Sequence, residues 1–155
     1  MMQHELKASI DIKAPPEAVW QVLLDFPRYL EWSEFLVHID GPAVPGSRLR
    51  VGIVDANGNA QVFKPEVLQV TPVRTFRWLG SLGVPGLLDR EHGFFLEYLF
   101  GGSTRLRQTV IFSGFLTPLL WRRLESPTLE GFAVFNDALK QRAESSSWQR
   151  RQSPR

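Results

Sequence analysis

The whole middle of the chain, from residue 35 to residue 114, has the pattern of β-strands, and a single long helical segment follows it. Apolar and polar residues alternate through much of this region, and turn pairs such as Gly41-Pro42 and Gly101-Gly102 divide it. An antiparallel sheet of this kind has an apolar face that another layer must cover. The pattern therefore predicts an α+β fold in which the C-terminal helix packs on a sheet.

About seven strands are expected, with two short helices after the first of them. Pro15 and Pro16 end the first strand and begin a helix, and Pro27 begins the second helix. Pro65 predicts an edge or a bulge, and Pro127 is expected to kink or divide the long C-terminal helix. The strands are expected at residues 4–13, 35–40, 48–53, 60–71, 73–80, 90–100 and 103–114.

Length and residue content narrow the function classes. A chain of 155 residues is one domain by size, and the absence of cysteine excludes disulfides, thiolate metal sites and a cysteine nucleophile. His4, His38 and His92 lie on separate segments, so no metal is expected, and no nucleotide-binding motif suggests a cofactor. The longest uncharged stretch, residues 108–121, is too short for a membrane span. Because no secretory leader is visible, a cytoplasmic location is expected.

The basic charge of the chain lies at its C-terminal end. Residues 141–155 hold four Arg and one Glu, whereas residues 1–140 hold 14 Lys and Arg against 15 Asp and Glu. We therefore expect one domain over residues 1–144 and a disordered basic tail over residues 145–155. Nucleic acid is not an expected partner. A weak electrostatic contact between the tail and an acidic partner is the alternative interpretation.

Short motifs spread over residues 5–143 carry a resemblance to a known family. In chain order they are Ala14-Pro15-Pro16-Glu17 with Val19-Trp20, then Pro45-Gly46, Phe63-Lys64-Pro65, Phe76-Arg77-Trp78, Glu91-His92, Phe112-Ser113-Gly114, and Gly131-Phe132 with Asn136. Their order and spacing resemble the SRPBCC superfamily, the START-like, polyketide cyclase/dehydrase and lipid transport proteins. The resemblance implies a helix-grip fold, in which a curved antiparallel sheet wraps around a long C-terminal helix and leaves an apolar cavity.

Members of that superfamily bind lipids, sterols, polyketides or other hydrophobic molecules in the cavity, and some are cyclases or dehydratases. The superfamily has no universal catalytic motif, so the resemblance implies the fold more than the function. This sequence departs from the family pattern at Gly93 and Phe95, where polar outward residues are usual, and at Gln108, which replaces a more commonly ionisable residue. The first departure implies an apolar contact on the outer face, and the second removes one acid or base.

Alternation along the strands assigns an inward face, and the long helix supplies the facing wall. His92 and Tyr98 are the candidate catalytic residues, His92 as a general acid or base and Tyr98 as a donor to a carbonyl. Gln108 would orient a ligand. The expected cavity lining is Trp32, Phe35, Val51, Ile53, Trp78, His92, Phe94, Leu96, Tyr98, Gln108, Val110, Leu124, Thr128, Phe132 and Phe135. The alternative interpretation is that these side chains fill the core.

Two further groups of residues are interpreted as surface. Arg90, with Asp89 and Glu91, is expected to form a solvated cluster at a strand end, or a charged rim at an entrance. The apolar stretches 82–88 and 115–121 are interpreted as gates or a dimer patch, and the alternative interpretation is that they hold single exposed apolar residues.

Three functions stay open. The first is binding of a hydrophobic small molecule, of lipid, polyketide or aromatic type, for transport, storage or sensing. The second is a polyketide cyclase or dehydratase that uses His92 and Tyr98. The third is a protein-interaction module that uses the outer surface around Phe95 and the basic tail. The inward face offers few polar groups and no expected carboxylate or arginine, which favours binding without catalysis. A homodimer stays open as well.

Overall fold

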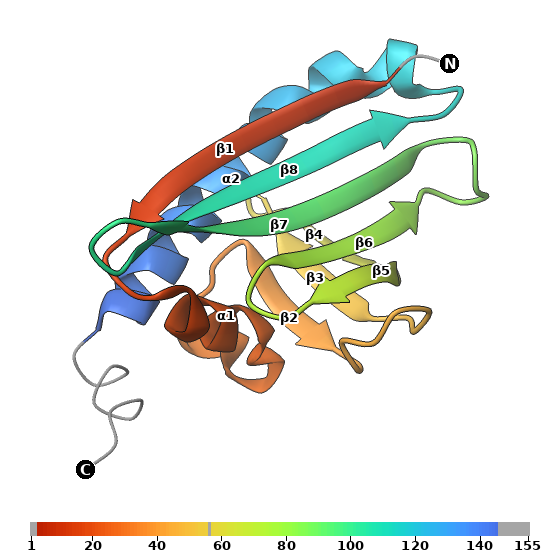
Figure 1. Cartoon of the computed structure of the whole chain (residues 1–155). Coiled ribbons are helices and arrows are strands. Elements are labelled where there is room, and N and C mark those ends of the chain that lie inside the picture. Colours follow the sequence, from red (N-terminus) through yellow and green to blue (C-terminus); the bar gives the residue numbers. More distant parts are fainter. Residues whose placement is uncertain (1–2, 56, 146–155) are drawn as a thin grey trace.

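The computed structural model of this chain describes residues 3–55 and 57–145. Its helices and strands follow one another in the order of an α+β fold (Figure 1). They are β1 (His4–Ile12), α1 (Pro16–Leu24), the 3₁₀ helix η1 (Phe26–Glu31), β2 (Leu36–Asp40), β3 (Arg50–Val54), β4 (Ala60–Phe63), β5 (Glu66–Thr71), β6 (Thr75–Ser81), β7 (Asp89–Leu99), β8 (Ser103–Ser113) and α2 (Thr117–Glu144). The predicted fold class, an antiparallel sheet with a long C-terminal helix and two short helices after the first strand, is confirmed.

The strands form two antiparallel sheets that are joined at one edge. β1, β8, β7, β6 and β5 form a five-stranded sheet in that order, and β2, β3 and β4 form a three-stranded sheet. An isolated bridge between Arg48 and Glu66 links the two sheets, and the N–H of Leu49 donates to the carbonyl oxygen of Pro65 at 2.9 Å. In Figure 1 the three-stranded sheet lies behind β5 and β6, so the combined β-layer is strongly curved.

Pro65 breaks a strand rather than only bending it. The strand expected over residues 60–71 is two strands, β4 and β5, which lie on either side of Pro65 and belong to different sheets. Proline has no N–H to donate to a ladder, and its ring restricts the residue before it. The chain therefore leaves one sheet at Pro65 and enters the other.

The long helix α2 is continuous through Pro127, so the expected division of this helix is wrong. It runs behind β1 and β8 in Figure 1 and packs on both strands and on α1. Pro127 is exposed and costs the helix one backbone hydrogen bond to the preceding turn. Phe132, Phe135 and Leu139 are fully buried in the turns that follow, and their burial holds that half of the helix on the sheet.

A close contact between α2 and the segment before β2 requires glycine in the helix. Gly131 is buried, and a Cβ atom at this position would overlap the ring of Phe35. Glycine is normally unfavourable inside a helix by about 1 kcal/mol relative to alanine. The packing of the Phe35 ring outweighs that preference here.

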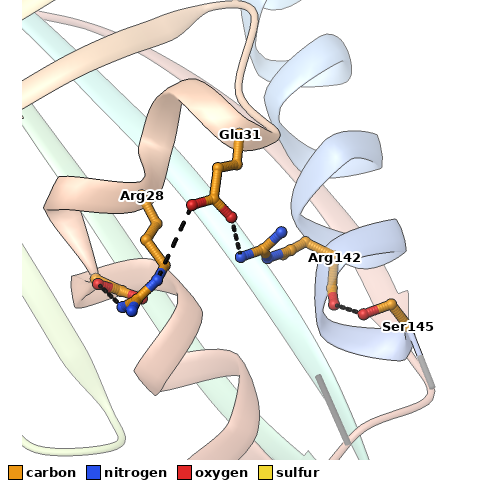
Figure 2. Close-up of polar contacts among 5 residues, drawn as sticks. Arg28, Glu31, Arg142 and Ser145 are labelled. Atoms are coloured by element: carbon orange, nitrogen blue, oxygen red, sulfur yellow. Dashed lines mark hydrogen bonds and ion pairs between the residues drawn. The ribbon is translucent and has the colours of Figure 1, made fainter. Parts of the chain in front are cut away.

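Charged side chains connect η1 to the last turn of α2 (Figure 2). Nη2 of Arg142 lies 2.7 Å from Oε1 of Glu31, and Arg28 lies 4.0 Å from the other oxygen of the same carboxylate. At the end of the helix, Oγ of Ser145 donates to the carbonyl oxygen of Arg142 at 2.9 Å. These contacts position the short helix beside the C-terminal one.

The predicted domain boundary after residue 144 stays a prediction, because the structure is described only to residue 145. α2 ends at Glu144, and residues 146–155 of the expected basic tail lie outside the described residues. The tail therefore stays a prediction. None of the helices within the described residues has the length and apolar character that crossing a membrane requires.

Candidate ligand-binding site

Three buried polar side chains form a hydrogen-bonded chain through the core, one each from β7, β8 and α2. His92 Nε2 lies 2.7 Å from Oε1 of Gln108, and Gln108 Nε2 donates to Oδ1 of Asn136 at 2.8 Å. Because the Gln108 amide nitrogen is the donor to Asn136, its oxygen accepts from His92, and Nε2 therefore carries the imidazole proton. His92 and Gln108 both lie on the inward side that strand alternation assigned to them.

Asn136 was not among the predicted site residues. It is 3% exposed, and it lies four residues after Phe132 and three before Leu139, both of which are fully buried. That helical spacing places position 136 on the buried face of α2. The signal was therefore present in the sequence, although it does not identify Gln108 as the partner.

Burial keeps the imidazole of His92 neutral. Desolvation lowers the pKa of His92 to about 3, the hydrogen bond that His92 donates to Gln108 acts in the opposite direction, and the charge of Arg90 lowers the pKa further. The Phe94 ring stacks on the imidazole with 4.5 Å between centroids, and the Trp78 ring lies at 4.9 Å. Near neutral pH, His92 is an uncharged hydrogen-bonding group.

Most of the predicted cavity lining is packed core. Trp78, Phe94, Phe132 and Phe135 are fully buried, and the centroids of the Phe94 and Phe135 rings lie 5.6 Å apart. The buried members of the predicted lining are Phe35, Val51, Ile53, Trp78, His92, Phe94, Leu96, Gln108, Val110, Phe132 and Phe135, and the partly buried members are Trp32, Leu124 and Thr128. In the middle of the sheet, these side chains fill the space between the sheet and α2. The expected cavity therefore does not lie among the aromatic rings.

Tyr98 does not share an interior site with His92, which corrects the predicted pairing. Its side chain is 65% exposed, and Phe100 beyond it is fully exposed. Six residues of strand separate it from His92, which corresponds to about 20 Å. Alternation predicted the side of the strand but not its cover, since Thr104, the register partner of Tyr98 on β8, is fully buried whereas Tyr98 is exposed. Tyr98 instead borders a shallow surface hollow with Arg74 and Arg107.

A pocket of about 670 Å³ opens at the opposite end of β7, between β4, β6 and the first half of α2. Gly80 lies in the same register row as Arg90 and Phe112, and a Cβ atom at this position would lie 3.3 Å from the Phe63 ring, so the glycine lets that ring approach the sheet closely. Leu124, one of the residues of the expected cavity lining, borders this pocket from α2. The lining comprises Gln61, Val62, Phe63, Lys64, Gly80, Ser81, Leu82, Gly83, Leu88, Arg90, Phe112 and Leu124.

Arg90 borders this pocket and is partly buried, so the solvated-cluster interpretation is wrong for it, whereas the alternative of a charged rim at an entrance stays a prediction. Its side chain is partly buried, and the guanidinium carbon lies 4.5 Å from the centroid of the Phe63 ring. Desolvation lowers the pKa of Arg90 to about 10. Arg90 is two residues from the inward His92, so alternation places it inward. The sequence reasoning put it outside because arginine at a strand end is usually solvated.

The loop at residues 82–88, which contributes Leu82, Gly83 and Leu88 to the pocket lining, lies beside the segment 115–121. The N–H of Phe115 donates to the carbonyl oxygen of Gly86 at 3.0 Å, which joins the apolar stretches 82–88 and 115–121. Gly114 permits this approach, because it has a φ of +107° and a Cβ there would lie 2.8 Å from the Gly86 oxygen. The interpretation of these stretches as gates or a dimer patch stays a prediction.

The lining of the pocket combines apolar side chains with two cationic ones. Its walls are mainly apolar, and its charged groups, Arg90 and Lys64, are both cations. The described part of the chain contains no group of three His, Asp or Glu side chains that could hold a metal ion. Apolar walls with a few polar groups are typical of a small-molecule site.

Comparison with family models gives one match over nearly the whole described chain. The model described as polyketide cyclase / dehydrase and lipid transport matches residues 3–144. The search of curated proteins found no match.

Solved structures with the same fold include an aromatase/cyclase and a START superfamily protein. The Zhui aromatase/cyclase from a Streptomyces species has a TM-score of 0.74 at 18% identity, covering 92% of this chain and 94% of that one. A START superfamily protein from Mycobacterium smegmatis has a TM-score of 0.69 at 22% identity, with 91% and 97% covered. A protein from Mesorhizobium loti has a TM-score of 0.68 at 25% identity, with 97% and 100% covered. These likenesses establish the fold.

Proposed function

The chain belongs to the polyketide cyclase / dehydrase and lipid transport family, and on this basis we propose that it binds a hydrophobic small molecule for transport, storage or sensing. The binding site is the pocket between β4, the loop after β6 and the first half of α2. The aromatic and aliphatic walls of this pocket provide the driving force.

The observation that carries the proposal is a pocket of about 670 Å³ with apolar side chains on three sides. Phe63 comes from the three-stranded sheet, Phe112 from the five-stranded sheet, and Leu124 from α2. Removing a ligand's apolar surface from water contributes about 25 cal/mol per Å² before the entropic costs of binding are subtracted. A molecule with one or two rings, or a medium-length acyl chain, suits this volume.

Filling the pocket tests the proposal. Leu124→Trp places an indole in the pocket from the α2 side, whereas Leu119→Trp adds the same ring at a position of α2 that is 74% exposed. Fluorescence titration with the neutral apolar dye N-phenyl-naphthylamine should give saturable binding to the wild type and to Leu119→Trp. Binding to Leu124→Trp should be weaker by about tenfold or more. Equal affinity of all three proteins for the dye would show that this pocket is not the binding site.

A cyclase or dehydratase is the second candidate, and the orientation of His92 by Gln108 favours it. Two observations count against it. A pKa of about 3 makes His92 a weak base near neutral pH, since general bases work best with a pKa near the operating pH. Tyr98 is too far away to act with it. If His92→Gln abolished turnover of an aromatic polyketide substrate while dye binding was retained, the enzyme would replace the binding protein as the better account.

A further inference from the structure

Arg90 is a cation on an apolar wall, and nothing in the described residues neutralises it. Among residues 3–55 and 57–145, no carboxylate lies within ion-pair distance of its guanidinium, and no side-chain hydrogen bond engages it. The guanidinium carbon lies over the face of the Phe63 ring, 4.5 Å from the ring centroid. A cation over an aromatic ring is stabilised only modestly.

The carboxylates next to Arg90 in the sequence are engaged elsewhere. Glu91 lies on the other side of the strand and pairs with Arg77 at 3.0 Å. Asp89 accepts a hydrogen bond from Oγ of Ser81 at 2.8 Å and another from the N–H of Gly86 at 3.1 Å. Glu91 therefore pairs on the outer face and Asp89 binds the loop, so neither carboxylate pairs with Arg90. The guanidinium of Arg90 is available to a molecule that enters the pocket.

Keeping an unpaired charge partly out of water is unfavourable, and the lowered pKa of Arg90 reflects that cost. A hydrophobic side chain would suit the position of Arg90, since its register partner Phe112 and the nearby pocket residue Leu88 are both apolar. The second cation that borders the pocket, Lys64, is exposed. The two cations of the pocket are therefore one partly buried residue, Arg90, and one exposed residue, Lys64, and the pocket lining contains no acid that would compensate them.

We infer that the ligand is an amphipathic acid, whose apolar body lies against Phe63, Phe112 and Leu124 and whose oxyanion binds the guanidinium of Arg90. The inference rests on the proposed binding function and adds the chemical class of the ligand. A guanidinium presents parallel N–H donors that match the two oxygens of a carboxylate, and the same fork accepts a sulfonate or a phosphate. Partial burial strengthens this pairing, because water competes less for both groups.

A pair of dyes that differ by one charged group tests the inference. Anilinonaphthalene sulfonate and N-phenyl-naphthylamine share the same aromatic body, but only the first carries an oxyanion. Both are titrated into the wild type, Arg90→Met, Arg90→Lys and the control Arg107→Met. Arg107 is the matched control because it also lies over a phenylalanine ring, that of Phe95 at 5.6 Å, but it is exposed on the outer face.

The expected result is a selective loss of affinity for the anionic dye. Arg90→Met should bind anilinonaphthalene sulfonate about tenfold more weakly or worse, with N-phenyl-naphthylamine unchanged, and Arg107→Met should bind both as the wild type does. Arg90→Lys keeps the positive charge but not the parallel N–H donors of the guanidinium. Its affinity for the sulfonate should therefore lie between those of the wild type and Arg90→Met. The melting temperature of unliganded Arg90→Met should be at least that of the wild type, because an unpaired charge has been removed.

Three outcomes separate this inference from the proposed function. Equal sulfonate affinity in the wild type and in both Arg90 variants overturns the inference, while N-phenyl-naphthylamine binding that is lost in Leu124→Trp still supports the pocket. Failure of the wild type to bind either dye overturns both. Competition by decanoate, decyl phosphate and decanol then identifies the head group, and displacement by decanol as effective as that by either acid counts against an oxyanion.

Discussion

The imidazole of His92 donates a hydrogen bond to the side-chain oxygen of Gln108 across neighbouring strands, with 2.7 Å between Nε2 and Oε1. Gln108 in turn donates a hydrogen bond to Asn136 of α2, so this series of hydrogen bonds spans both layers of the fold. Each of the three side chains is nearly inaccessible to solvent. A buried polar chain of this kind is stable only while its members stay paired and uncharged.

Acidification should destabilise the protein through His92. The pKa of this residue is about 3 in the folded state and about 6.5 in an unfolded chain, so the unfolded state binds the proton more tightly. The stabilising effect of keeping His92 neutral is complete above about pH 6.5 and declines as the pH falls toward 3. Urea unfolding should show a loss of about 2 kcal/mol between about pH 7.5 and about pH 5.

His92→Gln is the variant that isolates this effect, with His38→Gln as the control on the exposed side of β2. His92→Gln should be less stable at neutral pH but should lose less stability on acidification than the wild type. His38→Gln should keep the wild-type pH dependence. A pH dependence that is identical in all three proteins would show that His92 titrates normally.

Removing Gln108 should cost more than its own hydrogen bonds. Gln108→Leu leaves His92 Nε2 and Asn136 Oδ1 buried without the partner they have in the wild type. A buried polar group that loses its partner costs about 1–3 kcal/mol. Chemical denaturation should therefore show a lower free energy of unfolding for Gln108→Leu. Adding Asn136→Leu should recover part of the loss, because the second orphaned group is then removed as well.

Alanine at position 131 should destabilise the protein, although helix propensity alone predicts the opposite. Propensity favours Gly131→Ala by about 1 kcal/mol. The new Cβ, however, overlaps the Phe35 ring, which is 7% exposed and has little room to move. Thermal unfolding should show a lower melting temperature for Gly131→Ala, and combining it with Phe35→Leu should be less harmful than the two separate losses added together. A more stable Gly131→Ala protein would contradict the packing argument.

Glu31 should contribute little to stability, despite its prominent place between Arg28 and Arg142 (Figure 2). Its side chain is 52% exposed, so water and salt screen both pairs. Glu31→Gln should lower the free energy of unfolding by less than about 1 kcal/mol, with a smaller difference at high salt. A loss of several kcal/mol at high salt would indicate that the pairs are effectively buried.

Local pattern predicted the elements of this fold well. Alternation and turn residues placed the strands, and the proline positions placed the starts of α1 and η1. Pro65 and Pro127 were harder because the effect of a proline depends on its surroundings. Pro65 separates two sheets, whereas Pro127 is accommodated within α2, where the buried side chains that follow outweigh one lost hydrogen bond.

For the site, the sequence by itself determined which side of each strand a residue occupies. It therefore placed His92, Gln108 and Leu124 inward, and the same alternation applied to Arg90 would have placed it there too. Only the tertiary structure decided which inward positions are covered, filled or open. Tyr98 is exposed although its register partner Thr104 is buried, the aromatic rings fill the centre, and the pocket lies beside Arg90 between the two sheets and α2. Alternation is a property of one strand, whereas cover and free volume depend on segments that are distant in the chain and meet only on folding.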